Sequence, residues 1–401
     1  MSLLDVGVIQ MRQHAFSKRI ANLELSETYA ILDMVRSLRE QGEDIVDLGG
    51  GEPDFRTPEH VVDAAVEALS DGDTHYTPSR GTKALLDAVA HKYKTEHALD
   101  LAADKNIIIT PSAKHALFIA LMTLLDEGDE IIIPTPSWVS YKAMAAMAGA
   151  TVKAVPLDGR NGFLLEPQVL EQAITPRTKA ILINNPNNPT GRVLTREEVE
   201  GVVQVALKHG LYIISDEIYE RVIYGQARHI SIASIAGAED ITVTISGFSK
   251  AYAMTGWRLG YVVAAEPIAN EMLKVHQHTV GCAGSFIQRG GIAALKGCQQ
   301  RIADMVTAYQ RRRDRLIDGL EKIPGIQCIA PEGALYIFAS IADLGFENSL
   351  SFTRWLLSTA KVAVTPGTAF GEGGEGYIRL SFAGSDEAID EAVKRFHHAF
   401  Q

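Results

Sequence analysis

The residues best suited to chemistry lie in the segment S-G-F-S-K-A-Y-A-M-T-G-W-R-L-G-Y at 246–261. Lys250 follows an apolar strand pattern and is surrounded by small and hydroxyl residues. A surface position is the commonest alternative for any single lysine, whereas a half-buried lysine is a nucleophile towards an aldehyde. Ser249 directly precedes this lysine and Arg258 lies eight residues after it, and both offer donors to an anion. The segment therefore predicts a nucleophilic lysine beside an anion site.

A second candidate is the run S-D-E-I-Y at 215–219. Asp216 ends a buried apolar strand pattern, and ligands of parallel sheets gather at the carboxyl ends of strands. A carboxylate at such a place needs a partner, for which the pyridinium nitrogen of a ligand is suitable. The alternative is a helix N-cap, a role that Asp often has. Tyr219 is expected either to donate to a ring hydroxyl of that ligand or to pack in the core.

Three further motifs follow strand patterns. N-N-P-N-N-P-T-G at 184–191 is an irregular loop that presents the Asn188 amide, although Asn-Pro turns are common. T-P-S-A-K-H-A at 110–116 is a strand-to-helix junction, where the free N–H groups around Ala113 and Lys114 suit a phosphate. P-S-W-V-S-Y at 136–141 places Trp138 where it either stacks on a flat ring or packs in the core.

Two other patterns carry no site. G-E-G-G-E-G at 371–376 matches a dinucleotide-binding pattern, but it precedes a strand and opens no helix. His276 and His278 flank Gln277 without a third ligand nearby, which favours a helix face or a subunit contact. We therefore expect no metal site.

The elements that must position these residues alternate along the chain. Runs rich in β-branched residues and lacking polar alternation are typical of strands buried on both faces. Helix patterns separate them, including 112–125 and 195–210, the second with Thr195 as N-cap and Glu198 at the capping-box position. This alternation predicts an α/β protein with a mainly parallel seven-stranded sheet and helices on both faces. The seven runs are 106–110, 130–134, 151–156, 179–184, 211–216, 241–246 and 259–264.

The C-terminal part has a different pattern. A long helix is expected over 299–324, followed by short strands at 334–340 and 376–382 and a last helix over 386–400. This order indicates a smaller α+β domain. We therefore divide the chain into an N-terminal segment packing with the small domain (1–55), a large ligand-binding domain (56–300) and a small C-terminal domain (301–401).

Composition narrows the classes of function. The chain has 401 residues, a formal net charge of −11 and three cysteines outside any metal-ligand spacing. An acidic protein is a poor partner for nucleic acid, although a few local donors suffice for one phosphate. The cysteines cannot form a disulfide framework, and no apolar stretch is long enough to span a membrane. We expect a cytoplasmic protein with no nucleic acid or membrane partner.

Taken together, these motifs resemble the class I/II aminotransferases of pyridoxal phosphate (PLP) fold type I, in their bacterial aspartate/aromatic branch. The resemblance rests on S-x-x-S-K-x-x-x-M-T-G-W-R-L-G, S-D-E-I-Y, N-N-P-N-N-P-T-G and Y-I-R-L-S-F. It covers nearly the whole chain, from about Leu25 to the C-terminus, and the motifs occur in the order typical of the family. It implies a transaminase that uses pyridoxal 5'-phosphate as cofactor.

The resemblance also implies a role for each matching residue. Lys250 would carry the cofactor as a Schiff base and then shuttle a proton. Asp216 would pair with the ring nitrogen, Tyr219 and Asn188 with the ring oxygen, and Trp138 with the ring face. Ser249, Arg258 and the Ala113–Lys114 backbone would hold the phosphate, to which the neighbouring subunit of a homodimer would contribute Tyr76. Arg379 would bind the substrate α-carboxylate, helped by Trp138, Asn188 and the backbone of Gly51.

The sequence departs from the family pattern at two places that concern phosphate binding. The usual G-I-P-x-L-R reads G-T-K-A-L-L at 81–86, and Gly247 stands three residues before the lysine, where some relatives keep a serine. Lys114 matches a position where relatives with acidic substrates have a lysine, the alternative being an exposed helix lysine. We expect an aspartate or glutamate donor with 2-oxoglutarate as acceptor, and aromatic amino acids second.

The same resemblance is compatible with two other functions. A PLP-dependent lyase (β/γ-elimination) or a decarboxylase on the same fold would release pyruvate, ammonia or carbon dioxide without an oxo-acid acceptor. A PLP-binding regulator would need an attached DNA-binding region, for which the residues before Leu25 are too few. The transaminase is the preferred hypothesis.

Overall fold

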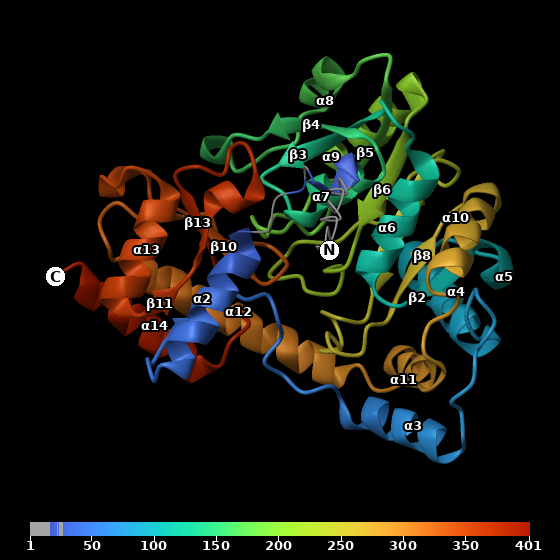
Figure 1. The fold of residues 1–401 in the computed structure, drawn as a ribbon, viewed down its shortest axis with the longest axis horizontal. Helices are drawn as coiled ribbons and strands as arrows, with labels where there is room; N and C mark the ends of the chain where they lie inside the picture. Colours follow the sequence, from blue (N-terminus) through green and yellow to red (C-terminus); the bar gives the residue numbers. More distant parts are fainter. Residues whose placement is uncertain (1–16, 22, 24–26) are drawn as a thin grey trace, which may run out of the picture.

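The computed structural model describes residues 17–401 except 22 and 24–26. Two sheets dominate it, one of seven strands and one of four (Figure 1). The long helix α12 (Gln300–Leu320) runs from the helices beside the large sheet to those around the small one. Within the described residues, no helix is both long and apolar enough to cross a membrane.

The large sheet has the strand order β2-β8-β7-β6-β5-β3-β4. All neighbouring pairs are parallel except those of β8, which is antiparallel to β2 and to β7. The prediction of a mainly parallel seven-stranded sheet is therefore confirmed. Its strands are β2 (Ile107–Thr110), β3 (Glu130–Thr135), β4 (Thr151–Pro156), β5 (Thr178–Asn184), β6 (Tyr212–Asp216), β7 (Thr242–Gly247) and β8 (Gly260–Val263).

Burial on both faces explains the unbroken apolar runs of these strands. Ile107 and Ile109 of β2 pack with residues of α4 (Lys83–His97), whereas Ile108 packs with residues of α6 (Ala113–Leu124). Alternate residues of a strand point to opposite faces, so a strand covered on both sides has no place for polar alternation. The other helices near this sheet are α3 (Glu59–Ser70), α5 (Ala103–Asn106), α7 (Ser140–Met147), α8 (Pro167–Ala173), α9 (Arg196–His209), α10 (Glu266–Thr279) and α11 (Ser285–Lys296).

Helix α9 has the ends that its sequence predicts. The Thr195 side chain accepts a hydrogen bond from the Glu198 N–H, and the Glu198 carboxylate accepts one from the Thr195 N–H. Gly210 ends the helix in the left-handed conformation with φ 64°. This capping box and glycine stop satisfy N–H and C=O groups that helix ends otherwise leave free.

The small sheet has the order β12-β13-β10-β9, with every pair antiparallel. Strand β1 (Val46–Asp47) pairs with β11 (Val362–Ala363), so the chain before residue 55 contacts the C-terminal part. The domain boundaries at 55 and 300 stay a prediction, and part of the segment 1–55 lies outside the described residues. The remaining elements here are α2 (Glu27–Glu40), β9 (Gln327–Cys328), β10 (Tyr336–Ser340), α13 (Ser349–Ala360), β12 (Thr365–Pro366), β13 (Tyr377–Ser381) and α14 (Asp386–Ala399). The short helix α1 (Lys18–Ala21) instead contacts α7 beside the large sheet.

Helix α12 is shorter than the sequence suggested, because it ends at Leu320 and not at residue 324. The N–H of Ile323 bonds to the carbonyl of Leu320, which turns the chain after the helix. This turn brings the Ile323 side chain into the core of the small region, where it is buried. Burial of one apolar side chain thus decides where the helix stops.

Candidate active site

A cavity of about 320 Å³ lies at the carboxyl ends of the large sheet's parallel strands, against residues of the small region. Eleven of the twelve site residues expected from the sequence line it. The exception is Tyr76, which is 96% exposed and does not reach the cavity of its own chain. The eleven are Gly51, Ala113, Lys114, Trp138, Asn188, Asp216, Tyr219, Ser249, Lys250, Arg258 and Arg379.

One wall of the cavity is a cradle of hydrogen-bond donors. Helix α6 begins at Ala113 after Ser112, whose φ of 99° turns the chain sharply into the helix. Gly260 of β8 permits this approach, because a Cβ there would lie 2.3 Å from the Ala113 nitrogen. Ser249 and Arg258 line the same cavity, the latter with φ 53°. A helix N-terminus, a hydroxyl and a guanidinium together form a site suited to a phosphate.

Lys250 follows β7 and lies in this cavity, half-buried. Its Nζ donates to the carbonyl oxygen of Gly51, 2.5 Å away, and lies 5.8 Å from the centroid of the Tyr219 ring. Gly51 has no room for a side chain, because a Cβ there would lie 2.1 Å from the Tyr336 hydroxyl. The amine therefore lies where the two parts of the chain meet.

Asp216 is a buried carboxylate that forms no ion pair with the residues that the structure describes, although the Lys250 ammonium is near enough to oppose the rise in pKa that burial causes. Oδ2 accepts from the Tyr141 hydroxyl at 2.8 Å, and Oδ1 accepts from the Ile218 N–H at 3.2 Å. Burial raises the pKa of Asp216 to about 6, and the Tyr141 and Ile218 donors oppose that rise. Because an isolated buried charge is costly, the site suits a ligand with a cationic ring nitrogen.

Arg379 of β13 is a buried guanidinium that has only neutral partners. Its Nη1 donates to Asn188 Oδ1 at 3.1 Å and its Nη2 to the Gly49 carbonyl at 2.6 Å. Its Nε has no partner among the described residues, and burial lowers its pKa from the usual value. A guanidinium with a free donor inside a cavity is suited to binding a carboxylate in a two-bond geometry.

Two tyrosines connect these groups. The hydroxyls of Tyr219 and Tyr336 lie 2.8 Å apart, and the Arg379 guanidinium lies 4.3 Å from the centroid of the Tyr336 ring. Burial, and then the neighbouring Tyr336, raise the pKa of Tyr219 well above its usual value. Tyr219 therefore keeps its proton and can donate it to a ring oxygen in the cavity.

Asn188 and Trp138 complete the lining. The Asn188 N–H donates to Asn184 Oδ1 at 2.8 Å, and Asn184 Nδ2 donates to the carbonyl of Asp216 at 3.0 Å. The loop after β5 is thus tied to the end of β6. The Lys114 ammonium lies 4.8 Å from the centroid of the Trp138 ring, so the cavity has both a cation and a flat aromatic face.

Sequence reasoning did not assign Tyr141, Tyr336 or Asn184 to the site. Tyr141 had a signal, because it ends the P-S-W-V-S-Y motif and comes three residues after Trp138, one helical turn. Asn184 begins the quoted loop motif and had the same kind of signal. Tyr336 had none, since only the packing of the small region brings it to the cavity.

Gly247, one of the two departures from the family pattern, has a structural reason. A Cβ at this position would lie 2.9 Å from the Gly260 Cα on the adjacent strand. The close approach of β7 and β8 therefore requires glycine at this pair. The same Gly260 gives room to the start of α6, so the spacing of these strands also shapes the cradle.

Comparison with known proteins gives a consistent family. The family model described as aminotransferase class I and II matches residues 43–396. An aspartate aminotransferase of Musicola paradisiaca is 55% identical over 375 residues, which cover 94% of this chain and 94% of that protein. An aromatic-amino-acid aminotransferase 2 of Thermococcus litoralis is 39% identical and covers 95% and 97%.

Solved structures agree with these sequence relatives. The aspartate aminotransferase of Thermus thermophilus with maleate superposes with a TM-score of 0.91 at 37% identity. This match covers 96% of our protein and 100% of the Thermus protein. The fold, including the position of the large and small sheets, is therefore shared over nearly the full length.

Proposed function

The chain belongs to the class I and II aminotransferases, and we propose that it binds PLP through Lys250 and transfers the amino group of a dicarboxylic amino acid. The observation that carries this proposal is that one cavity contains several charged groups whose partners of opposite charge are absent from the chain. A half-buried lysine lies among an anion cradle, a carboxylate without a cation and a guanidinium without a carboxylate. PLP and an amino acid together have the groups that these residues lack.

The residues of the cavity fit the cofactor one group at a time. The start of α6, Ser249 and Arg258 would hold the phosphate, and Asp216 would hold the ring nitrogen. Tyr219 and Asn188 would donate to the ring oxygen, and Trp138 would cover the ring face. Bound PLP supplies an electron sink for the charge that is left on the substrate when its α-proton is removed.

The protein's own part in the reaction is positioning and proton transfer. Lys250 Nζ would remove the proton from the substrate Cα as general base and would then deliver it to the cofactor as general acid. Arg379, which is held by Asn188 and Gly49, would fix the substrate α-carboxylate so that the Cα–H bond faces Lys250.

A dicarboxylic substrate is favoured by Lys114. Its ammonium lies over the Trp138 ring in the cavity lining, where it would pair with a distal carboxylate. The relative from Musicola is named for aspartate, and the Thermus relative binds maleate, a dicarboxylate. Aromatic amino acids are the second class, supported by the Trp138 face and by the Thermococcus relative named for aromatic substrates. We propose 2-oxoglutarate as acceptor.

We also propose a homodimer with shared active sites. Tyr76 is 96% exposed and does not reach its own cavity, which fits a residue that serves the phosphate of a second subunit. A cytoplasmic location belongs to the same proposal and is supported by the three free cysteines. Sedimentation of the wild type as a dimer, with weaker PLP binding in Tyr76→Phe, would support this arrangement; a monomer with full PLP affinity would contradict it.

The experiment for the main proposal is an absorbance titration of the purified protein with PLP, followed by L-aspartate, L-glutamate and L-phenylalanine. We expect a visible band that disappears with an effective amino donor and returns with 2-oxoglutarate. Lys250→Ala should show no such band and no turnover. A band that persists while pyruvate or ammonia accumulates would favour the lyase alternative, and a Lys250→Ala protein with normal turnover would end the proposal.

A further inference from the structure

Behind the active site lies a second group of buried charges that the proposed reaction does not use. Asp216 ends β6 and the chain turns directly after it, so we call residues 216–220 the turn. Asp216 and Tyr219 of this turn line the cavity, whereas Glu217 and Glu220 point away from it into the protein. Both glutamates are buried, and Glu217 is fully inaccessible to solvent.

Glu217 joins the turn to the loop before η2 (Ile232–Ser234). Its Oε1 accepts from the hydroxyls of Ser215 and Ser231, at 2.9 and 3.1 Å, and from the Ile232 N–H at 3.1 Å. Its Oε2 lies 3.0 Å from His229 Nε2. Burial alone would raise the pKa of Glu217, but His229 lowers it below its usual value, so the carboxylate stays charged and keeps all four contacts.

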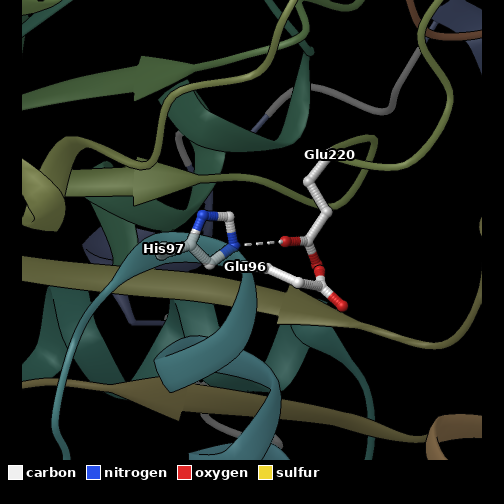
Figure 2. A group of neighbouring side chains, drawn as sticks. All are labelled: Glu96, His97 and Glu220. Atoms are coloured by element: carbon white, nitrogen blue, oxygen red, sulfur yellow. Dashed lines mark hydrogen bonds and ion pairs between the residues drawn. The ribbon is translucent and has the colours of Figure 1, made fainter.

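Glu220 joins the same turn to the sheet and to α4. Its Oε1 accepts from the Ser246 hydroxyl of β7 at 2.8 Å. Its Oε2 lies 2.6 Å from Lys92 Nζ and 3.3 Å from His97 Nε2, both on α4. Figure 2 shows Glu96 and His97 of that helix pointing toward Glu220. One carboxylate thus fixes the turn to two other elements.

The composition of this cluster resembles that of a metal site, but its cation is a lysine. Glu96, His97 and Glu220 have ligand atoms within 4.8 Å of one another, and so do Glu217, Glu220 and His229. Lys92 Nζ contacts Glu220, the one residue that both groups share, and lies 3.5 Å from Glu96. Burial alone would lower the pKa of Lys92, but Glu220 holds it above its usual value. A divalent cation would meet this ammonium at contact distance, which Coulomb repulsion disfavours.

We propose that Glu217 and Glu220 are positioning residues for the cofactor, because their buried bonds hold the turn so that the Asp216 carboxylate and the Tyr219 hydroxyl face the ring. The proposal rests on the proposed function. Two residues of one turn reach the ligand and two reach a rigid polar cluster, so a shift of the cluster moves both ligand-binding groups together. Small displacements of a fixed donor or acceptor are costly for a bound ligand.

The first test uses the Lys92–Glu220 pair. Glu220→Gln leaves a buried ammonium without its main partner, whereas Lys92→Met/Glu220→Gln removes both charges at similar volume. We expect the single variant to raise the dissociation constant of PLP about tenfold or more, as the loss of one partner of a buried pair disturbs its surroundings, and the double variant to restore most of the affinity. The ¹⁵N chemical shift of labelled PLP should report weaker contact of the ring nitrogen with Asp216 in the single variant alone.

The matched control is Glu130→Gln, which lies at the amino ends of the strands, away from the cavity at their carboxyl ends. Glu130 is also buried and accepts from the Thr175 hydroxyl at 2.6 Å and the Arg177 guanidinium at 2.5 Å, at the amino end of β3. This variant should lose thermal stability and keep the wild-type PLP affinity and ring-nitrogen shift. Equal stability losses in Glu220→Gln and Glu130→Gln, with PLP affinity unchanged in both, would overturn the positioning role.

A second pair of variants tests Glu217 and guards against a folding defect. Glu217→Gln keeps an oxygen for the three donors on Oε1, whereas Glu217→Leu removes every acceptor at similar volume. We expect PLP affinity close to wild type in the first and clearly weaker in the second, with a changed ring-nitrogen shift. Equal PLP affinities would overturn the proposal, as would a stoichiometric metal ion whose removal by a chelator lowers PLP affinity. A wild type that does not bind PLP would instead remove the proposed function itself.

Discussion

The buried charges on the two sides of the turn 216–220 differ in whether they have ion-pair partners. On the cavity side, neither Asp216 nor Arg379 forms an ion pair with another described residue. On the far side, the Glu217 carboxylate faces His229 and the Glu220 carboxylate faces Lys92. The three carboxylates of Asp216, Glu217 and Glu220 are close in sequence and all buried, so burial alone does not distinguish them.

The difference lies in where the compensating charge comes from. In the far cluster the chain supplies both signs, which gives a fixed structure whose members depend on one another. In the cavity the chain supplies only one member of each pair. The folded protein therefore has the free-energy cost of an unpaired buried charge, which a bound ligand can remove. Buried charges without an ion-pair partner therefore mark the proposed site for cofactor and substrate, whereas paired charges mark the structure that supports it.

The largest expected effect is on the cavity side, in Asp216→Asn. Removing this one preorganised charge should lower kcat by about 10³-fold, the scale seen for such groups. The visible band of bound PLP should persist, because Lys250 is intact. Steady-state kinetics with saturating PLP would measure the loss. A variant with wild-type kcat would place the ring nitrogen away from Asp216.

The same variant should also become more stable without cofactor. The raised pKa of Asp216, about 6, means that the folded protein binds this proton more tightly than the unfolded chain does. Its contribution to stability is present below about pH 4 and is lost as the pH rises through about 6, which amounts to ~3 kcal/mol. Denaturation of the cofactor-free proteins at pH 5 and pH 8 should show an advantage of Asn that grows with pH; a constant difference would contradict this account.

Arg379→Lys is the next largest. A lysine keeps the charge but cannot offer two parallel bonds to a carboxylate, so KM for the amino donor should rise about 100-fold. The absorbance of bound PLP should stay unchanged, since Arg379 is expected to touch the substrate and not the ring. Titration of the band with aspartate would measure the change. An unchanged KM would remove Arg379 from the substrate site.

Lys92→Met tests the paired charges on the far side of the turn. It leaves the Glu220 carboxylate buried without its main cation, which should lower the free energy of unfolding by about 3–5 kcal/mol. In contrast to Arg379→Lys, the KM for the amino donor at saturating PLP should stay close to wild type, because Lys92 does not line the cavity, whereas PLP affinity should fall as in Glu220→Gln. Urea denaturation and kinetics on the same preparation would separate the two effects. A large KM change with full stability would show that the two sides are not distinct.

The smallest expected effect is that of Lys114→Gln. An ion pair that is partly open to solvent contributes about 1 kcal/mol, so KM for aspartate should rise about fivefold. Phenylalanine lacks a distal carboxylate and serves as the internal control, with an unchanged KM. An equal loss for both amino acids would show that Lys114 supports the cavity in general and does not select dicarboxylates.

The sequence by itself determined the architecture and most of the site. The seven strand runs needed only local pattern, because strands buried on both faces have no polar alternation. The ends of α9 followed from Thr195, Glu198 and Gly210, since caps act within one helical turn. The position of Asp216 at a strand end likewise indicated a ligand, because the parallel order brings such ends to one edge.

Only the tertiary structure decided which charges are paired. Lys92 and Glu220 are 128 residues apart, and nothing in either local pattern indicates that they meet. Tyr336 reaches Tyr219 across 117 residues, and Tyr76 stays outside the cavity although its motif resembles a site motif. Sequence periodicity reports which face of an element is buried, but the partner on that face comes from a distant element. Whether a buried charge has an ion-pair partner within the chain is therefore decided by the tertiary packing.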